Sequence, residues 1–421
     1  MMPEMVETVV IGGGQAGLAL SSCLTGLGHD HVILERGRLA ERWRSERWDS
    51  LTLITPNWMT QLPGFAYQGD DPEGFIGRDE VVQLLEDYAA SFDPPLRSGV
   101  HVESVQPHDG VSRYLVQTTD LVHGSAVTIA ARNVVVATGP FHKPRIPPLS
   151  AALPAGVLQL ASRDYRNPAQ LPPGAVLVVG SGASGCQICE DLSASGRTVY
   201  FSIGRCQRWP RRYRGTDLVT WFDIMGLLDE VGRRQYLDPS YGCPAVLTGV
   251  RGGYDLDYDR FAAEGVTLLG HLRDADGGTV VFADDLRESL VLWDASREIL
   301  ERMIDTYIQR AGLDAAADEE GQLPAASTAW RSRPPILELD LAACGITSIV
   351  WTTGFNYDFG WLEVPVLDTN GEPIQLRGVT TSPGLYFLGL RRMYKMKSSF
   401  LFGVGEDAVY LAEQIAGRPS A

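Results

Sequence analysis

The sequence predicts an α/β protein with two Rossmann-like dinucleotide-binding domains. Two segments carry this prediction, residues 7–17 and 175–185, because each runs from a strand rich in valine through three glycines into a helix-like stretch. Each is followed by a second short apolar strand, at residues 31–34 and 198–202, which is how a βαβ unit begins. A chain of 421 residues is long enough to hold both units as separate domains.

The bulk composition is typical of a globular protein, with 44% hydrophobic and 21% charged residues. A net charge of −16 argues against nucleic acid or an anionic membrane as the partner. The chain shows no signal peptide and no apolar run of roughly 18 residues, so it is expected to be cytoplasmic and not to cross a membrane. The six cysteines are too few and too scattered for a disulfide framework.

The first fingerprint is Gly12-x-Gly14-x-x-Gly17, at the junction of a predicted strand and helix. Gly12 permits a tight turn, Gly14 lets the backbone approach a pyrophosphate, and Gly17 allows close packing of helix on strand. The pyrophosphate is expected to bind the free N–H groups at the start of the helix. Glu35 closes the next strand, where a carboxylate accepts hydrogen bonds from a ribose. The residues expected to contact this first dinucleotide are Gly12, Gly14, Gln15, Ala16, Gly17, Glu35 and Arg36.

The second fingerprint is Gly180-x-Gly182-x-x-Gly185, and the strand that follows it carries no acidic residue at the corresponding place. A 2′-phosphate is repelled by a carboxylate and held by guanidinium and hydroxyl groups. The strand is instead followed by basic and hydroxyl residues, namely Ser202, Arg205, Arg208, Arg211 and Arg212. NADPH is therefore predicted in preference to NADH, with a solvated basic loop as the alternative. The residues expected to contact NADPH are Gly180, Gly182, Ser184, Gly185, Ser202 and Arg205.

Other glycine turns and one arginine- and tryptophan-rich stretch extend the predicted cofactor contacts. Two strand-like sequences end in Thr-Gly, as expected where a chain passes close to a dinucleotide or crosses between domains. Residues 42–51 could cover a flavin and its phosphates, or could pack around a loop. The contacts expected from these segments are Arg42, Trp43, Ala137, Thr138, Gly139, Thr353 and Gly354, and Val102 is expected as a further cofactor contact.

Cys186 and Cys189 form a C-x-x-C motif, which in other settings is a redox dithiol. They lie in the first turns of the helix after Gly185, where small apolar side chains pack a helix onto a sheet. Structural packing is therefore predicted for both. The seven histidines show no metal-ligand spacing with cysteines or carboxylates, so no metal site is predicted.

These motifs, in this order, resemble the bacterial flavin-containing monooxygenase-like family of class B flavoprotein monooxygenases, in the branch often labelled as putative flavoproteins of potassium transport. The resemblance covers nearly the whole chain. Beside the two fingerprints it rests on Trp43 with the leucine–proline run after it, residues 62–64, 137–139, 164–168, 378–380, 384–389 and 403–408.

The resemblance implies a fold of the glutathione-reductase type, in which one dinucleotide-binding domain is inserted into the other. The expected division is a first part of the FAD-binding domain at residues 1–155, an NADPH-binding domain at 156–325, and the second part of the FAD-binding domain at 326–421. FAD would then occupy the first fingerprint and NADPH the second.

The resemblance also implies the chemistry of a monooxygenase. In the family, NADPH gives a hydride to FAD, the reduced flavin takes up O₂, and a peroxyflavin delivers one oxygen atom to a small-molecule substrate, most often at nitrogen or sulfur. Relatives carry an asparagine near the flavin that helps to hold the peroxyflavin and NADP⁺. Asn57, in Thr55-Pro56-Asn57, matches that position and is the predicted catalytic residue.

The chain departs from the family at one place. The family's linker signature ends in a histidine followed four residues later by tyrosine or tryptophan, and here Tyr165 is kept whereas Ala161 replaces the histidine and Val157 an expected glycine. The alternatives left open are an NADPH oxidase or reductase that passes electrons to another acceptor, Baeyer–Villiger oxygenation, and a flavin-binding sensor. The substrate and the oligomeric state, including a homodimer, are also left open.

Overall fold

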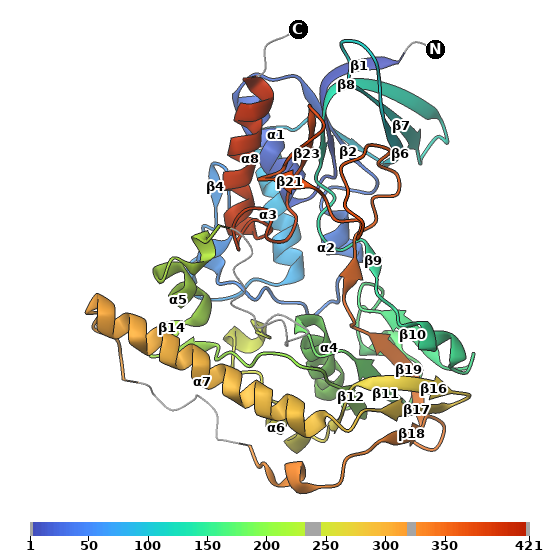
Figure 1. Ribbon diagram of the computed structural model, residues 1–421, viewed down its shortest axis with the longest axis vertical. Helices are drawn as coiled ribbons and strands as arrows, with labels where there is room; N and C mark the ends of the chain where they lie inside the picture. The colour runs from blue at the N-terminus through green and yellow to red at the C-terminus, as the bar shows by residue number, and fades with distance from the viewer. Residues whose placement is uncertain (1–2, 232–245, 318–325, 418–421) are drawn as a thin grey trace.

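The computed structural model describes residues 3–231, 246–317 and 326–417, and it forms two regions that are each built around a sheet with a parallel centre (Figure 1). One region, at the top of the view, contains both ends of the described chain. The other contains the second fingerprint, with the long helix α7 (Leu286–Ala311) beside it. This architecture confirms the predicted α/β class with Rossmann-type dinucleotide-binding units.

The first sheet has the strand order β21-β22-β23-β8-β1-β2-β5, and β7 and β6 continue from β8. The neighbours β23, β8, β1, β2 and β5 run parallel. Such strands are covered on both faces, which explains their unbroken runs of valine and isoleucine. Their bounds are β1 (Glu4–Ile11), β2 (His31–Glu35), β5 (Leu96–Ser98), β6 (Val100–Pro107), β7 (Tyr114–Asp120), β8 (Ala126–Val136), β21 (Gln375–Leu376), β22 (Val379–Thr380) and β23 (Leu385–Phe387).

The C-terminal part of the chain completes the region that the N-terminal third begins. Strand β23 pairs with β8, and the C-terminal helix packs against the helix of the first fingerprint. The contact is apolar, since Leu18, Val404 and Leu411 are fully buried. The helices of this region are α1 (Gln15–Gly26), α2 (Glu41–Ser45), α3 (Arg78–Ala90) and α8 (Leu401–Ala416).

The second sheet has the order β10-β19-β11-β12-β15 and all its pairs are parallel. Its strands are β10 (Leu158–Ala161), β11 (Ala175–Val179), β12 (Val199–Ser202), β15 (Thr267–Leu269) and β19 (Ile346–Trp351). Helices α4 (Ala183–Ala194), α5 (Leu218–Ile224) and α6 (Tyr258–Ala263) accompany it, together with a small sheet of β16 (Leu272–Asp276), β17 (Thr279–Phe282) and β18 (Glu338–Asp340). Short hairpins pair β3 (Gln61–Leu62) with β4 (Phe65–Ala66) and β13 (Arg212–Tyr213) with β14 (Thr216–Asp217).

The sheets divide the chain differently from the expected ranges. Strand β19 lies between β10 and β11 in the second sheet, although it falls in the range 326–421 that was expected to return to the first region. Its apolar sequence fits either sheet, and only its pairing decides between them. The chain returns to the first sheet after β19, through the antiparallel pair of β9 (Lys143–Pro144) and β20 (Phe355–Asn356).

Each sheet has its own apolar core. Val9, Val134 and Leu385 are fully buried in the first, and Val178 and Ile188 in the second. In the three ranges that the structure describes, no helix combines the length and the apolar character needed to span a bilayer.

The packing of the second fingerprint predicts that Gly185→Ala is destabilising. A Cβ built on Gly185 would lie 1.9 Å from the carbonyl oxygen of Gly180, so helix α4 must shift away from β11. We expect a loss of at least about 2 kcal/mol in the free energy of unfolding, measured with urea. Gly182→Ala is the matched control, because a Cβ there meets no atom within 4 Å, and it should cost less than about 1 kcal/mol. Equal losses in the two variants would contradict the packing argument.

Candidate functional site

The first fingerprint joins three elements at the carboxyl edge of the first sheet. Gly12 has φ +114°, and a Cβ on it would lie 2.6 Å from the carbonyl oxygen of Ala137, at the end of β8. A Cβ on Gly17 would lie 1.9 Å from the carbonyl oxygen of Gly12. The structure therefore brings the predicted Gly12, Gly17 and Ala137 together, and glycine is required at two of them because backbone occupies the space of a side chain.

Gly14 leaves the start of α1 open. A Cβ there would meet no atom within 4 Å, and Gly14 caps α1 without a side-chain hydrogen bond. The first turn of α1 contains no acidic residue. Free N–H groups at the positive end of a helix, next to unoccupied space and without a competing carboxylate, fit a pyrophosphate. The residues present therefore fit the dinucleotide expected at this fingerprint.

Glu35 ends β2 next to this opening. Its carboxylate accepts hydrogen bonds from the backbone N–H groups of Gly13, at 2.7 Å, and Gly37, at 2.8 Å. These bonds fix the side chain at the edge of the sheet, where its remaining lone pairs can accept from a ribose. The neighbouring Arg36 is exposed.

A segment that the fingerprint argument missed also borders the start of α1. The side-chain amide of Gln15 donates to the carbonyl oxygen of Ser399 at 2.9 Å. A Cβ on Gly389, which has φ +77°, would lie 2.7 Å from the Cβ of Ala16. The segment 389–399 therefore frames the first dinucleotide site, and it begins at a glycine two residues after a buried strand.

The second fingerprint repeats the geometry of the first. A Cβ on Gly180 would lie 2.8 Å from the carbonyl oxygen of Thr352, and the space beside Gly182 is open. The hydroxyl of Thr352 donates to the carbonyl oxygen of Val179 at 2.8 Å and also contacts that of Gly180. Ser184 lies in the first turn of α4. Thr352 thus has the place in the second site that Ala137 has in the first, and it was not among the predicted contacts.

The two residues expected to hold a 2′-phosphate differ in their surroundings. Ser202 is buried, and its hydroxyl donates to the carbonyl oxygen of Gly270 at 2.9 Å and accepts from the N–H of Leu272 at 3.2 Å. Arg205 follows the same strand, pairs with Glu288 at 2.8 Å, and remains 43% exposed. Of the two, only Arg205 is accessible to a ligand in this conformation.

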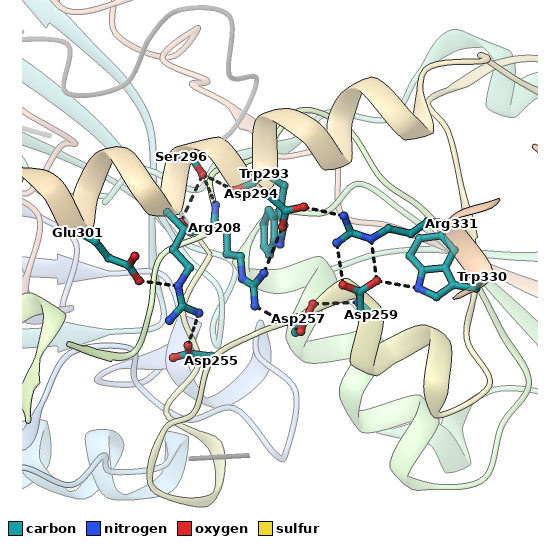
Figure 2. Close-up of polar contacts among 11 residues, drawn as sticks. Arg208, Asp255, Asp257, Asp259, Trp293, Asp294, Ser296, Glu301, Trp330 and Arg331 are labelled. Carbon is teal, nitrogen blue, oxygen red and sulfur yellow. Dashed lines mark hydrogen bonds and ion pairs between the residues drawn. The ribbon is translucent and has the colours of Figure 1, made fainter. Parts of the chain in front are cut away.

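The other arginines of the basic cluster are engaged within the protein. Figure 2 shows Arg208 between Asp257 and Asp294, with N–O distances of 3.3 and 3.2 Å, and its backbone N–H on the hydroxyl of Ser296. Arg211 forms a buried ion pair with Asp217 at 2.5 Å. Arg208 therefore ties α7 to the start of α6, and Arg211 ties its loop to the start of α5, so the cluster is mainly structural.

The predicted contacts near the end of β8 lie side by side. Gly139 has φ +73°, the guanidinium of Arg42 donates to the carbonyl oxygen of Phe141, and Trp43 lies 5.6 Å from the guanidinium carbon of Arg47. Val102, by contrast, is buried within β6 and pairs with Thr118 of β7.

Thr353 and Gly354 lie where the chain crosses between the two regions. The hydroxyl of Thr353 donates to the carbonyl oxygen of Arg145, and the N–H of Arg145 donates to the carbonyl oxygen of Gly354 at 2.8 Å. Phe141 and Phe355 make an edge-to-face contact at 5.3 Å beside this crossing. The two connections are therefore bonded to each other, which fixes one region relative to the other.

His142 is a buried group of this crossing that the sequence did not single out. Its Nδ1 accepts from the N–H of Asp358 at 2.9 Å, so Nε2 carries the proton and donates to the hydroxyl of Thr138 at 3.1 Å. Burial, together with the nearby charge of Arg42, lowers the pKa of His142 to about 4. The imidazole is therefore neutral at physiological pH.

Asn57 is buried, and both polar atoms of its amide are engaged by backbone. Its Nδ2 donates to the carbonyl oxygen of Asp71 at 2.9 Å, and its Oδ1 accepts from the N–H of Ile76 at 2.8 Å. The N–H of Asn57 donates to the carbonyl oxygen of Gly74 at 2.9 Å. The observed partners of Asn57 are therefore the segment 71–76 of its own region.

The linker signature docks the first region on the second. Tyr165 is fully buried and donates to Asp191 of α4 at 2.7 Å, and the hydroxyl of Ser50 donates to the same carboxylate at 2.8 Å. Burial raises the pKa of Tyr165, and the hydrogen bond to Asp191 raises it further. Ala161 ends β10 opposite Trp351 and is buried. The position therefore holds an apolar contact rather than a titratable group.

Cys186 and Cys189 are both free and fully buried in the core of the second region. Burial raises the pKa of both thiols. A dithiol that reacts with a partner needs an accessible thiolate, so this motif packs α4 on the sheet, as the sequence predicts.

Lys395 and Lys397 form an ion-pair cluster with two carboxylates. Lys397 is buried and lies 2.9 Å from Asp229 and 2.6 Å from Glu406, and Lys395 pairs with the same two carboxylates at 2.7 and 2.6 Å. Asp229 follows α5, whereas Glu406 belongs to α8. The cluster therefore joins the insertion after β12 to the segment that frames α1.

Comparison with known proteins shows which families and solved structures this chain resembles. Residues 9–218 match the family described as pyridine nucleotide-disulphide oxidoreductase. An uncharacterized CzcO-like oxidoreductase of Geobacillus kaustophilus (strain HTA426) is 32% identical over 425 residues, covering 98% of this chain and 99% of that protein. Indole-3-pyruvate monooxygenase YUCCA1 of Oryza sativa subsp. japonica is 32% identical over 189 residues, 45% of each chain. The solved flavin-containing monooxygenase from Stenotrophomonas maltophilia has a TM-score of 0.64 at 20% identity, covering 98% of this chain and 99% of that one.

The depressed pKa of His142 predicts a specific loss of stability in acid. Because the folded pKa of about 4 lies below the ordinary value of 6.5, the folded state favours the neutral form, and the linked stability is complete above pH 6.5 and is lost as the pH falls towards 4. The loss should reach up to about 3 kcal/mol. Urea unfolding between pH 7.5 and 4.5 should show this extra slope in the wild type and not in His142→Gln. Parallel pH profiles of the two proteins would contradict it.

Proposed function

The chain belongs to the CzcO-like oxidoreductases and carries the pyridine nucleotide-disulphide oxidoreductase module, and from this premise we propose that it is an NADPH-dependent FAD monooxygenase. The family to which it belongs uses FAD together with NAD(P)H. The proposed reaction inserts one atom of O₂ into a small molecule, at nitrogen or sulfur, while NADPH is oxidised and the second oxygen atom leaves as water.

The observation that carries the proposal is the presence of two open, glycine-lined helix N-termini in one chain. Gly14 and Gly182 both border open space, and both cap their helices without a side-chain hydrogen bond. Two such sites support a pair of dinucleotides that exchange electrons, rather than a single bound nucleotide. The match to the YUCCA1 monooxygenase over 189 residues supports oxygenation as the fate of those electrons.

FAD bound at the first site would supply the redox chemistry, by accepting a hydride and reacting with O₂. The residues of the chain bind and orient it. The start of α1 holds the pyrophosphate, and Glu35 at the end of β2 accepts from the ribose. For Asn57 we propose a positioning role, because its amide holds the segment 71–76 in place.

NADPH is assigned to the second site. The start of α4 would hold its pyrophosphate, and Arg205 would turn from Glu288 to the 2′-phosphate. The crossing formed by β9 and β20 keeps the two sites in one orientation. Ala161 is buried and offers no titratable group at the linker, so at this position the chain would exclude water from the bound cofactors by packing.

Anaerobic addition of NADPH to the purified holoenzyme, followed by air, tests the function. We expect the visible flavin absorbance to bleach with NADPH far faster than with NADH, and a panel of amine and thioether compounds to yield oxygenated products after aeration. Release of one H₂O₂ for each NADPH oxidised, with every compound tested, would indicate an oxidase instead of a monooxygenase. If NADPH does not bleach the flavin absorbance, the proposal that the protein is this enzyme is wrong.

The choice of nicotinamide cofactor is predicted to depend on Arg205. Arg205→Gln should raise the KM for NADPH about tenfold and leave that for NADH unchanged, because it removes a charge-assisted bond to the 2′-phosphate. Glu288→Gln is the matched control, since it frees Arg205 from its ion pair and should leave the KM for NADPH equal or lower. Equal losses with both cofactors in Arg205→Gln would show that Arg205 does not read the phosphate.

A further inference from the structure

Two arginines enclose one phenylalanine ring beside the crossing between the two regions. The guanidinium carbon of Arg47 lies 4.9 Å from the centroid of the Phe141 ring, and that of Arg391 lies 4.7 Å from it. A guanidinium that lies over an aromatic ring is held through its flat face, which leaves the N–H groups at its edge free to donate.

The topology places these residues at the carboxyl edge of the first sheet. Phe141 follows β8 and Arg391 follows β23, and these strands are parallel neighbours, so both leave the sheet at the same edge. The fingerprint at the end of β1 opens at this edge as well. Arg145 follows β9 in the crossing, and its charge acts on Arg391. Ligands of open α/β sheets bind outside the carboxyl ends of the strands.

In the described residues these three arginines form no salt bridge, although the charge of Glu46 acts on Arg47 and Glu372 lines a pocket with Arg391. Within residues 3–231, 246–317 and 326–417, no carboxylate forms an ion pair with Arg47, Arg145 or Arg391, and the one hydrogen bond from the Arg47 side chain goes to the carbonyl oxygen of Glu46. Glu46, whose charge acts on Arg47, also lies 3.9 Å from Arg42 and 3.1 Å from Arg163. In the second region, Arg208 and Arg211 are by contrast paired with aspartates.

The arginines are crowded by protein and still open to solvent. Burial lowers the pKa of Arg391, with further lowering by Arg145 and Arg392, and burial lowers the pKa of Arg47 to about 10. Arg145 and Arg391 are nevertheless exposed, and Arg391 lines a pocket with Tyr357, Glu372, Gln375, Leu390 and Arg392. Side chains that are largely surrounded by protein and still reach solvent are typical of the lining of a crevice. Holding like charges there without an anion is unfavourable, and binding an anion relieves the repulsion.

We propose that Arg47 and Arg391, which lie over Phe141, form together with Arg145 an oxyanion-binding subsite at the mouth of the cofactor cleft. It takes the carboxylate or phosphate of the second ligand that reaches the flavin side of the cleft, and the fork of a guanidinium matches either group with two parallel hydrogen bonds. The inference rests on the proposed function, because it presumes that FAD occupies the first site.

The two sources of the oxyanion are an acidic substrate and the nicotinamide dinucleotide, and titration of the oxidised holoenzyme separates them. The probes are benzoate with benzamide as its neutral match, and NADP⁺ with NAD⁺, each followed by the change in the visible absorbance of bound FAD. The proteins are the wild type, Arg391→Gln, Arg47→Gln and Arg145→Gln. Arg310→Gln is the control, because Arg310 is an exposed arginine of α7.

We expect the Kd of at least one anionic probe to rise about tenfold or more in the three variants and to stay unchanged in Arg310→Gln. A rise for benzoate alone assigns the subsite to a substrate carboxylate, and a rise for NADP⁺ alone assigns it to a dinucleotide phosphate. Unchanged Kd values for both anions in all three variants, or failure of both to bind the wild type, would overturn the subsite.

The subsite and the proposed function fail in different ways. Loss of bleaching by NADPH in the wild type contradicts the function, whereas the titrations use the oxidised protein and need no turnover. If Arg391→Gln does not retain FAD, Arg391→Lys and Arg145→Gln carry the test. Lysine keeps the positive charge of arginine but not its pair of parallel N–H donors. If charge alone holds the anion, the Kd of the anionic probe should therefore rise less in Arg391→Lys than in Arg145→Gln.

Discussion

The structure depends on one repeated constraint, the contact of glycine with backbone at the carboxyl edge of each sheet. Gly17 packs on Gly12 in the first region, and Gly185 packs on Gly180 in the second, each leaving less than 2 Å for a Cβ. This contact brings each helix so close to its strand that the start of the helix opens at the sheet edge. The two open helix starts then provide positive ends for two dinucleotides.

The relation between the two sites comes from contacts that cross between regions. The antiparallel pair of β9 and β20 joins the two connections, and His142 fastens them through Thr138 and Asp358. The carboxylate of Asp191 receives hydrogen bonds from Tyr165 and Ser50. Electron transfer between dinucleotides requires their reactive rings to meet, so a fixed crossing has a direct bearing on function.

The arginines of the second region and those beside Phe141 differ in their ion pairing. Most arginines of the second region are paired within it, as Figure 2 shows for Arg208 and Arg331, the latter on Asp259 at 2.7 Å. Such pairs hold α7 on its neighbours and leave few free cations. Arg47 and Arg391 beside Phe141 differ because they form no salt bridge within the residues that the structure describes. The proposed subsite, positive within a chain of net charge −16, would concentrate anionic ligands beside the first fingerprint.

The sequence by itself determined both fingerprints, because Gly12, Gly17 and their counterparts act on atoms within a few residues of themselves. The structure confirmed the α/β class and the packing of Cys186 and Cys189 that this local pattern predicts. Only the tertiary structure decided which sheet receives β19, and that Ser202 is buried beside a strand 68 residues away. Its partners are distant in sequence, and no local pattern records whether a polar side chain meets a ligand or the protein itself.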